Sequence, residues 1–236
     1  MQDKREIVLD TETTGLDPEQ GDRIIEIGCV EIIDGLPTGR TYHQYINPAN
    51  REVDPEAAAV HGLTREKLKD CPIFAEIIGD FTDFIGTSPL VIHNAAFDIG
   101  FINAELKMHG FPIVPKTQVI DTLTLAQRRF PGSPASLDAL CKRFQIDNSA
   151  RDLHGALLDA QLLADVYLEL IGGRQHGLSL AQEATLSDAA TAQQGEKRET
   201  PYTARKGRIL SATPEESMAH AALLEKLKDP LWAGTQ

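Results

Sequence analysis

The length, composition and charge of the chain limit what it can be. With 236 residues and 42% hydrophobic content, the chain can form one well-buried domain plus an appendage, which excludes disorder throughout. No stretch approaches the ~18 apolar residues that span a bilayer, and no signal peptide is apparent, so we expect a cytoplasmic protein. The formal net charge of -12 repels phosphates, so any nucleic acid would be held mainly by metal ions or a partner.

The cysteines argue against a covalent or metal framework. Cys29, Cys71 and Cys141 are odd in number, far apart and free of Cys-x-x-Cys spacing. This pattern excludes a set of disulfides and a structural zinc site. We expect all three to be small core residues.

The first elements have strand patterns. They cover residues 5–10, 24–33 and about 40–46, and Asp34-Gly35 is a turn signal between the second and third. The chain therefore begins with an antiparallel meander.

From about residue 73 the apolar residues recur at helical spacing. The helical segments cover about 73–85, 97–107, 122–130, 136–144 and 156–171, and short strands fall near 89–93 and 118–121. The sequence thus predicts the α/β class with a mixed sheet.

The composition changes after Gly172-Gly173. The following residues are Ala, Gln, Thr, Ser and charged types with hardly an aromatic, which is typical of a flexible linker. At Thr213-Pro214 a capping hydroxyl and a proline at the first helical position predict the start of a short helix. We divide the chain into a folded domain (1–173), a linker (174–208) and a C-terminal segment (209–236).

Two acids mark the first strand. Asp10 and Glu12 follow the apolar run Ile7-Val8-Leu9, two residues apart. Residues i and i+2 of a strand lie on one face, so both carboxylates could bind the same divalent cations at the strand end. Acidic and hydroxyl residues are also ordinary at strand ends, and the pair alone leaves both interpretations open.

Further residues decide between these interpretations. Asp98 follows a second apolar run and Asn94, while His154 and Asp159 form a His-x4-Asp spacing. The ordered set resembles the histidine branch of the DEDD superfamily of 3'-to-5' exonucleases, and the tyrosine branch would have Tyr at Gly155. The strings DTETTGL, VIHNAAFDIGF, SLDALC and LHGALLDAQLLADVY are most similar to the proofreading (epsilon) subunits of bacterial DNA polymerase III, over about residues 5–172.

The resemblance implies a fold and a reaction. The fold would be ribonuclease H-like, a five-stranded mixed sheet flanked by helices. The reaction would be hydrolysis of DNA from its 3' end with release of 5'-mononucleotides. A mispaired terminus frays readily and only a single strand would reach the site, so editing requires no reading of bases.

The same resemblance assigns roles at the site. Carboxylates without thiolates suit hard cations, and we expect two divalent ions, Mg²⁺ or Mn²⁺. Asp10 would bridge both ions, Asp159 with Glu12 would hold the one that activates water, and Asp98 would act through bound water at the other. His154, on a loop before a helix, would be the general base; the alternative is a loop histidine bonded to backbone.

The implied contacts to the terminal nucleotide come from Asp10, Glu12, Glu56, His61 and Asp159. By themselves, Asp54-Pro55-Glu56 favours a helix start and His61-Gly62 a helix stop. Leu16, Thr11 and Thr13 could also contact the terminal base, and structural roles for them are equally open.

Other charged residues receive no site role. Asp17, Asp121, Asp138 and Asp152 lie near the matched strings without occupying metal positions, and Asp121 has the context of a helix cap. The pairs Arg128-Arg129 and Lys142-Arg143 could track phosphates, but charge pairs on helices are usually solvated faces, and we assign them no site role.

The tail suggests partners. Gln175 to Leu180 resembles a short sliding-clamp-binding peptide, a pattern that also arises by chance. A C-terminal helix with Met218, Ala222, Leu223 and Leu227 at helical spacing is marginal alone. The resemblance implies docking on the alpha subunit of DNA polymerase III, and the alternative is a helix that folds back on the domain.

Two other functions stay open. An exonuclease that trims RNA 3' ends would have the same acids and histidine, but it needs no long linker or partner helix. A tether between polymerase and clamp, with a merely structural nuclease fold, has no physical need for four converging acids.

Overall fold

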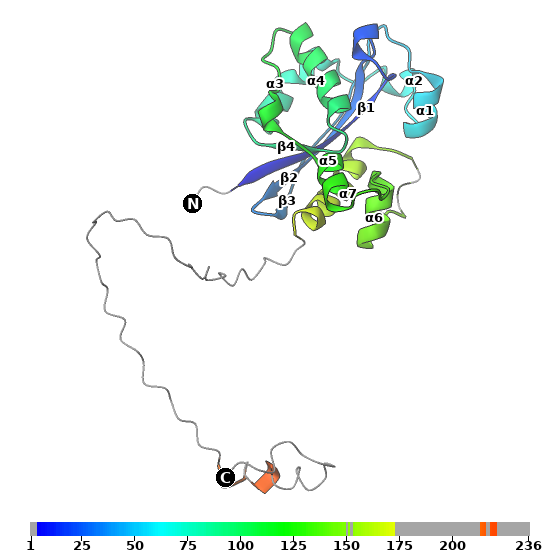
Figure 1. Ribbon diagram of the computed structural model, residues 1–236. Coiled ribbons are helices and arrows are strands. Elements are labelled where there is room, and N and C mark those ends of the chain that lie inside the picture. The colour runs from blue at the N-terminus through cyan, green and yellow to red at the C-terminus, as the bar shows by residue number, and fades with distance from the viewer. Residues whose placement is uncertain (1–3, 150, 152, 173–212, 216–217, 221–236) are drawn as a thin grey trace, which may run out of the picture. The chain divides into compact units, whose positions relative to one another are not determined.

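The computed structural model describes residues 4–149, 151, 153–172, 213–215 and 218–220 (Figure 1). Five strands form one sheet in the order β3-β2-β1-β4-β5. The strands are β1 (Arg5–Thr13), β2 (Ile24–Ile33), β3 (Leu36–Tyr45), β4 (Leu90–Ile92) and β5 (Val119–Asp121). The first three pair antiparallel, and β4 and β5 join them in parallel. The predicted meander and mixed sheet are confirmed.

Strand β1 is longer than its apolar pattern predicts. It pairs with β2 as far as Thr13, opposite Ile24, so Asp10 and Glu12 lie within the strand and not just beyond its end. The ladder of backbone hydrogen bonds extends the strand where hydrophobicity stops. On its other edge, β1 pairs with β4 only at Ile7 and Val8, so that edge is free of strand partners beside the acids.

The turn between β2 and β3 was predicted correctly. Asp34 and Gly35 both have positive φ, 50° and 77°. Two such residues form the turn whose twist suits a two-residue hairpin, and Asp-Gly is a preferred sequence for it.

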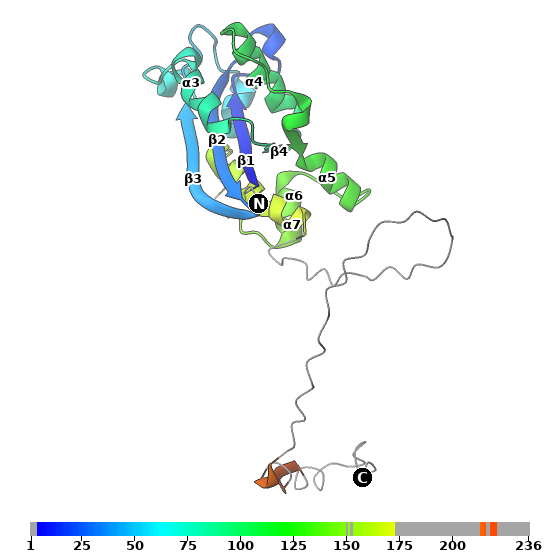
Figure 2. The same ribbon diagram turned by 90° about the vertical axis from the view of Figure 1, so that its left-hand side faces the viewer.

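Helices cover both faces of the sheet (Figures 1 and 2). The predicted helices are confirmed, with α1, α2 and two short 3-10 turns in addition. Their bounds are α1 (Pro55–His61), α2 (Arg65–Leu68), α3 (Phe74–Ile85), α4 (Ala96–Met108), α5 (Thr122–Arg129), α6 (Leu137–Phe144) and α7 (Ala156–Leu170), with η1 (Pro18–Gln20) and η2 (Lys116–Gln118).

Alternation along β1 divides the core into two layers. Ile7 and Leu9 belong to the layer that includes residues of α3 and α4, whereas Val8 belongs to the layer with α5, α6 and α7. Because side chains alternate along a strand, Asp10 and Glu12 continue the face of Val8, and Thr11 continues the face of Leu9. The sheet thus directs the two acids toward the α7 side.

The cysteines differ in burial. Cys29 and Cys141 are buried free thiols, as predicted. The prediction is wrong for Cys71, which is only half-buried because it lies in the turn after α2.

In the C-terminal part, residues 214–215 and 218–220 are helical, which confirms a helix after Thr213. The predicted linker, the peptide Gln175 to Leu180, Asp152 and most of the C-terminal segment lie outside the described residues. In the part of the chain that the structure describes, no helix has the length and apolar character of a membrane span.

Candidate active site

Acidic side chains from three elements and one histidine meet at an open cleft of about 640 Å³. Asp10 and Glu12 come from β1, Asp98 from the first turn of α4, Asp159 from the first turn of α7, and His154 from the loop before α7. The rest of the cleft is lined by Thr11, His93, Asn94, Phe97, Leu123, Ser136, Leu137, Asp138 and Arg151. The structure therefore brings together all five residues that the sequence predicts to hold or use metal.

A glycine brings α7 close to the acids of β1. Gly28 lies opposite Asp10 on β2, and a Cβ there would lie 2.2 Å from the carbonyl carbon of Ala156. No side chain fits in that space. The start of α7 therefore lies directly on the sheet, and the first turn of the helix presents Asp159 to the cleft.

Asp98 is held by the neighbouring strand. It is 4% exposed, and its Oδ1 accepts hydrogen bonds from the Thr11 backbone N–H at 3.1 Å and from the Thr11 hydroxyl at 2.7 Å. The Thr13 hydroxyl donates to the carbonyl of Gly15 at 2.6 Å. Both hydroxyls thus have structural partners, while Leu16 is 82% exposed and free to contact a ligand.

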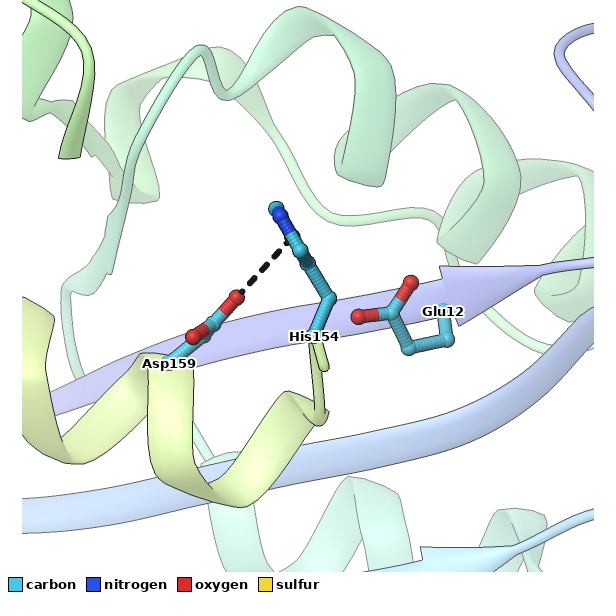
Figure 3. Close-up of side chains that lie close together, drawn as sticks. All are labelled: Glu12, His154 and Asp159. Carbon is cyan, nitrogen blue, oxygen red and sulfur yellow. Dashed lines mark ion pairs between the residues drawn. The ribbon is translucent and has the colours of Figure 1, made fainter. Parts of the chain in front are cut away.

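His154 stands between two carboxylates (Figure 3). Its Nδ1 lies 3.3 Å from Oδ2 of Asp159, and ligand atoms of Glu12, His154 and Asp159 all lie within 4.8 Å of one another. The His154 backbone N–H donates to the carbonyl of Val60, which fixes the loop against α1. The predicted loop position of this histidine is confirmed.

The carboxylates of the cleft are short of positive charge. Burial, reinforced by neighbouring carboxylates, raises the pKa of Glu12 to about 8. Burial also raises the pKa of Asp98 to about 7, against the lowering effect of its bonds from Thr11. The pKa of Asp10 lies well above its usual value because of burial and the negative charge of Asp98 and Glu12.

These residues fit divalent cations. The donors are mostly carboxylate oxygens, which hard cations prefer, and one imidazole is within reach. Because the pKa values of Asp10, Glu12 and Asp98 are raised, added positive charge favours their ionisation near neutral pH. Cation binding and proton release are coupled at such a site.

Arg151 is the residue of the cleft that the sequence analysis missed. Its guanidinium binds Asp159 through two hydrogen bonds, Nε to Oδ1 at 2.5 Å and Nη2 to Oδ2 at 2.6 Å. A signal was available, since Arg151 is the only Lys or Arg between residues 144 and 173. Its pairing could not be read from spacing, because the bonds depend on how the loop folds back on α7.

Glu56 and His61 lie on α1. Asp54 caps this helix, and Gly62 ends it at a φ of 72°, so the helix start and stop are confirmed. Of the residues that the structure describes, neither Glu56 nor His61 lines the cleft. The Nδ1 of His61 accepts from the Leu63 N–H, and its buried Nε2 has no partner among the described residues. Their contact with a nucleotide stays a prediction.

Several other charged side chains have structural partners. Asp121 caps α5, as predicted, by accepting from the Leu123 N–H. Arg129 donates to the carbonyls of Glu169 and Leu170 near the end of α7, and Arg143 lies over the Phe130 ring at 4.4 Å. These two arginines contact the protein itself and are not merely solvated.

Comparisons with known proteins identify the family of the chain. The exonuclease family model matches residues 7–167. The chain is 48% identical over 231 residues to the DNA polymerase III subunit epsilon of Rickettsia conorii, which covers 96% of this chain and 98% of that protein. It is also 48% identical to the same subunit of Escherichia coli, over 94% of this chain and 92% of that protein.

Solved structures show the same fold. Exonuclease X in complex with 5' overhanging duplex DNA aligns with a TM-score of 0.57 and 29% identity, over 70% of this chain and 90% of that one. The nuclease domain of 3'hExo, a DEDDh family member bound to rAMP, aligns with a TM-score of 0.61 and 18% identity, over 72% and 92%. The chain belongs to the exonuclease family and, within it, to the epsilon subunits of DNA polymerase III.

Proposed function

We propose that the cleft hydrolyses the terminal phosphodiester at the 3' end of DNA and so proofreads for a replicative DNA polymerase. The observation that carries this proposal is the convergence of Asp10, Glu12, Asp98 and Asp159 with His154 at one open cleft. The relatives named DNA polymerase III subunit epsilon support DNA replication as the setting.

The four acids are the proposed ligands of two divalent cations, Mg²⁺ or Mn²⁺. When bound, these cations would supply the charge that activates water and stabilises the departing 3' oxygen. Asp10 is central among them, because its carboxyl group is buried and the negative charges of the other three acids all act on it. Glu12 and Asp159 lie near each other and near His154.

His154 is the proposed general base. Its ring is 45% exposed and reaches the carboxylates from the loop, so it can accept a proton from water at the cleft and pass it to solvent. The hydrogen bond from its backbone N–H to the carbonyl of Val60 fixes the backbone position from which the ring extends. Glu12 and Asp159 lie on either side of the ring.

Selectivity for mispaired ends follows from access. Glu12, Asp98 and Asp159 are buried at the cleft, and a paired duplex end is wider than a single strand. A frayed 3' end therefore reaches the acids more often than a paired one. The net charge of -12 leaves the chain dependent on cations and on a partner to hold DNA.

The segments proposed to bind partner proteins lie in the C-terminal tail. The C-terminal segment 209–236 would dock on the polymerase alpha subunit, and Gln175 to Leu180 would bind the sliding clamp. Replacing Gln175 and Leu178 by Ala in the full chain tests the second contact. Retained co-elution of the variant with the clamp would contradict it.

The activity test uses the purified full chain on a 3'-mismatched DNA primer-template and on single-stranded RNA, with Mg²⁺ or EDTA. We expect metal-dependent release of deoxynucleoside monophosphates, and a 10²- to 10⁴-fold slower rate for His154→Ala. Arg128→Gln, at an exposed position outside the cleft, is the control that keeps the rate. Faster release from RNA would favour an RNA-trimming enzyme, and no release from either would favour a tether.

A further inference from the structure

Arg151 has no role in the proposed hydrolysis, yet its guanidinium contacts Asp159, His154 and Asp138 at the cleft. We propose that its guanidinium is the resident cation of the metal-free site, which holds Asp159 and His154 in an unproductive pairing and withdraws toward Asp138 when a divalent cation binds. This inference rests on the proposed metal site. It adds a residue that sets how readily the site loads metal.

The first observation is how Arg151 binds Asp159. Both carboxylate oxygens accept from the guanidinium, at 2.5 and 2.6 Å. The two side chains are nearly inaccessible to solvent, 7% and 3% exposed. A cation bound by Asp159 would need at least one of the same oxygens, so the ion pair and the metal would compete for one carboxylate.

The second observation concerns His154. Nη2 of Arg151 lies 3.0 Å from Nδ1 of His154. A guanidinium can only donate, so Nδ1 accepts and the proton of the neutral ring lies on Nε2. In this arrangement neither ring nitrogen is free to accept a proton from water. The same arginine is thus hydrogen-bonded both to Asp159, a proposed metal ligand, and to His154, the proposed general base.

The third observation is a second partner for the guanidinium. Nη1 of Arg151 lies 2.6 Å from Oδ1 of Asp138, a residue of α6 whose side chain is 61% exposed. Asn148 donates to the same oxygen at 3.2 Å and fixes it. When Asp159 binds a cation, Arg151 can remain at the cleft wall, because Asp138 still provides a carboxylate partner for its guanidinium.

Two other roles would give different results. A structural brace would stabilise the metal-free and metal-bound protein equally. An arginine that only binds substrate phosphate would change the KM for DNA and leave metal binding unchanged. Competition couples the loss of Arg151 to tighter metal binding, and so does the simple removal of its positive charge, which Arg151→Lys distinguishes.

The test is calorimetric titration of Mn²⁺ into the metal-free full chain, without DNA. We expect Arg151→Gln to bind about 10- to 100-fold more tightly, the gain for a protein in which the free site is about 10% to 1% populated. Arg151→Lys keeps the charge but loses the two-pronged geometry, so it should also bind more tightly. Arg128→Gln is the matched control and should bind as the wild type does.

The outcomes separate the two proposals. Wild-type affinity in both Arg151 variants overturns the competition and leaves the metal site intact. Tighter binding in Arg151→Gln alone assigns the effect to charge and also overturns it. No Mn²⁺ binding by the wild type overturns the metal site itself. Thermal unfolding gives a second reading: Arg151→Gln should lower Tm in EDTA but not in saturating Mn²⁺, and an equal loss in both overturns the proposal.

A measurement on the wild type keeps the test independent of variant folding. In protein with ¹⁵N-labelled arginine, one Nε–H signal should move on titration with Mg²⁺. The signals of Arg23, paired with Glu105, and of Arg5, paired with Glu31, lie in other ion pairs and should stay in place. A titration in which no arginine signal moves overturns the proposal.

Discussion

Buried acids occur in two regions of this molecule, and they are treated differently. Away from the cleft, Glu31 binds Arg5 at 2.6 Å, Glu105 binds Arg23 at 2.6 and 2.7 Å, and Glu6 accepts from Tyr167 at 2.8 Å. At the cleft, four acids have Arg151 as their one guanidinium partner among the residues that the structure describes.

The difference appears in the pKa values. Although burial raises it, bonds from Arg5 and Thr38 bring the pKa of Glu31 below its usual value. At the cleft the pKa of Glu12 rises to about 8. A buried charge with its own partner belongs to the fold, whereas a group of buried charges without enough partners is arranged for something that arrives from outside.

The largest effect is expected for Asp10→Asn, which tests whether the cleft acids lack enough positive charge. We expect the exonuclease rate to fall by about 10²- to 10³-fold or more, because a preorganised charge at the reacting centre is lost. The same change should raise Tm in EDTA, since it removes a carboxyl group whose ionisation is opposed by burial and by the negative charge of Asp98 and Glu12. A kinetic assay and a thermal melt of one preparation check both signs, and a lower Tm would contradict the charge shortage.

Glu105→Gln is the opposite case. Arg23 would be left half-buried without its carboxylate, which costs about 3 kcal/mol of unfolding free energy. The rate of the folded fraction should not change, because Glu105 lies outside the cleft. Urea unfolding and a single-turnover assay measure the two effects. A stability equal to that of the wild type would mean that this pair has no structural role.

Gly28→Ala disturbs the cleft without changing a charge. The added methyl group would meet the backbone of Ala156, and overpacking of this kind costs about 1–3 kcal/mol. The displacement of α7 should also slow hydrolysis, because Asp159 moves with it. Gly79→Ala in α3 is the control, since no atom lies within 4 Å of its Cβ position and alanine favours a helix.

The last prediction is a pH dependence of stability. The folded protein holds the proton of Glu12 up to a pKa of about 8, whereas the unfolded chain releases it near 4.5. The native state binds more protons in that window, so the stability of the metal-free protein should fall as pH rises from about 4.5 to 8. Urea unfolding in EDTA across this range measures the slope, and Glu12→Gln should reduce it. A rising stability would contradict the assignment.

The sequence predicts much of the fold and the members of the site. Asp10 and Glu12 share a face through strand periodicity, and Asp159 lies one turn into a helix that its apolar pattern reveals. Local rules determine both. The resemblance to known exonucleases supplied the ribonuclease H-like arrangement of sheet and helices, which periodicity does not contain.

What the sequence does not predict depends on distant contacts. The pairing of Arg23 with Glu105 joins residues 82 positions apart, and the grip of Arg151 on Asp159 depends on a loop conformation. The extension of β1 to Thr13 depends on its pairing with β2. None of these contacts produces a periodic pattern in the amino-acid sequence.

The position of α7 has a consequence for the time at which the protein becomes a nuclease. A nascent chain that has emerged as far as residue 150 already carries Asp10, Glu12 and Asp98, but not His154 or Asp159. The ribosome must release α7 before the helix can lie on Gly28 and close the site. On the roles proposed for His154 and Asp159, a product interrupted before residue 154 is expected not to hydrolyse DNA.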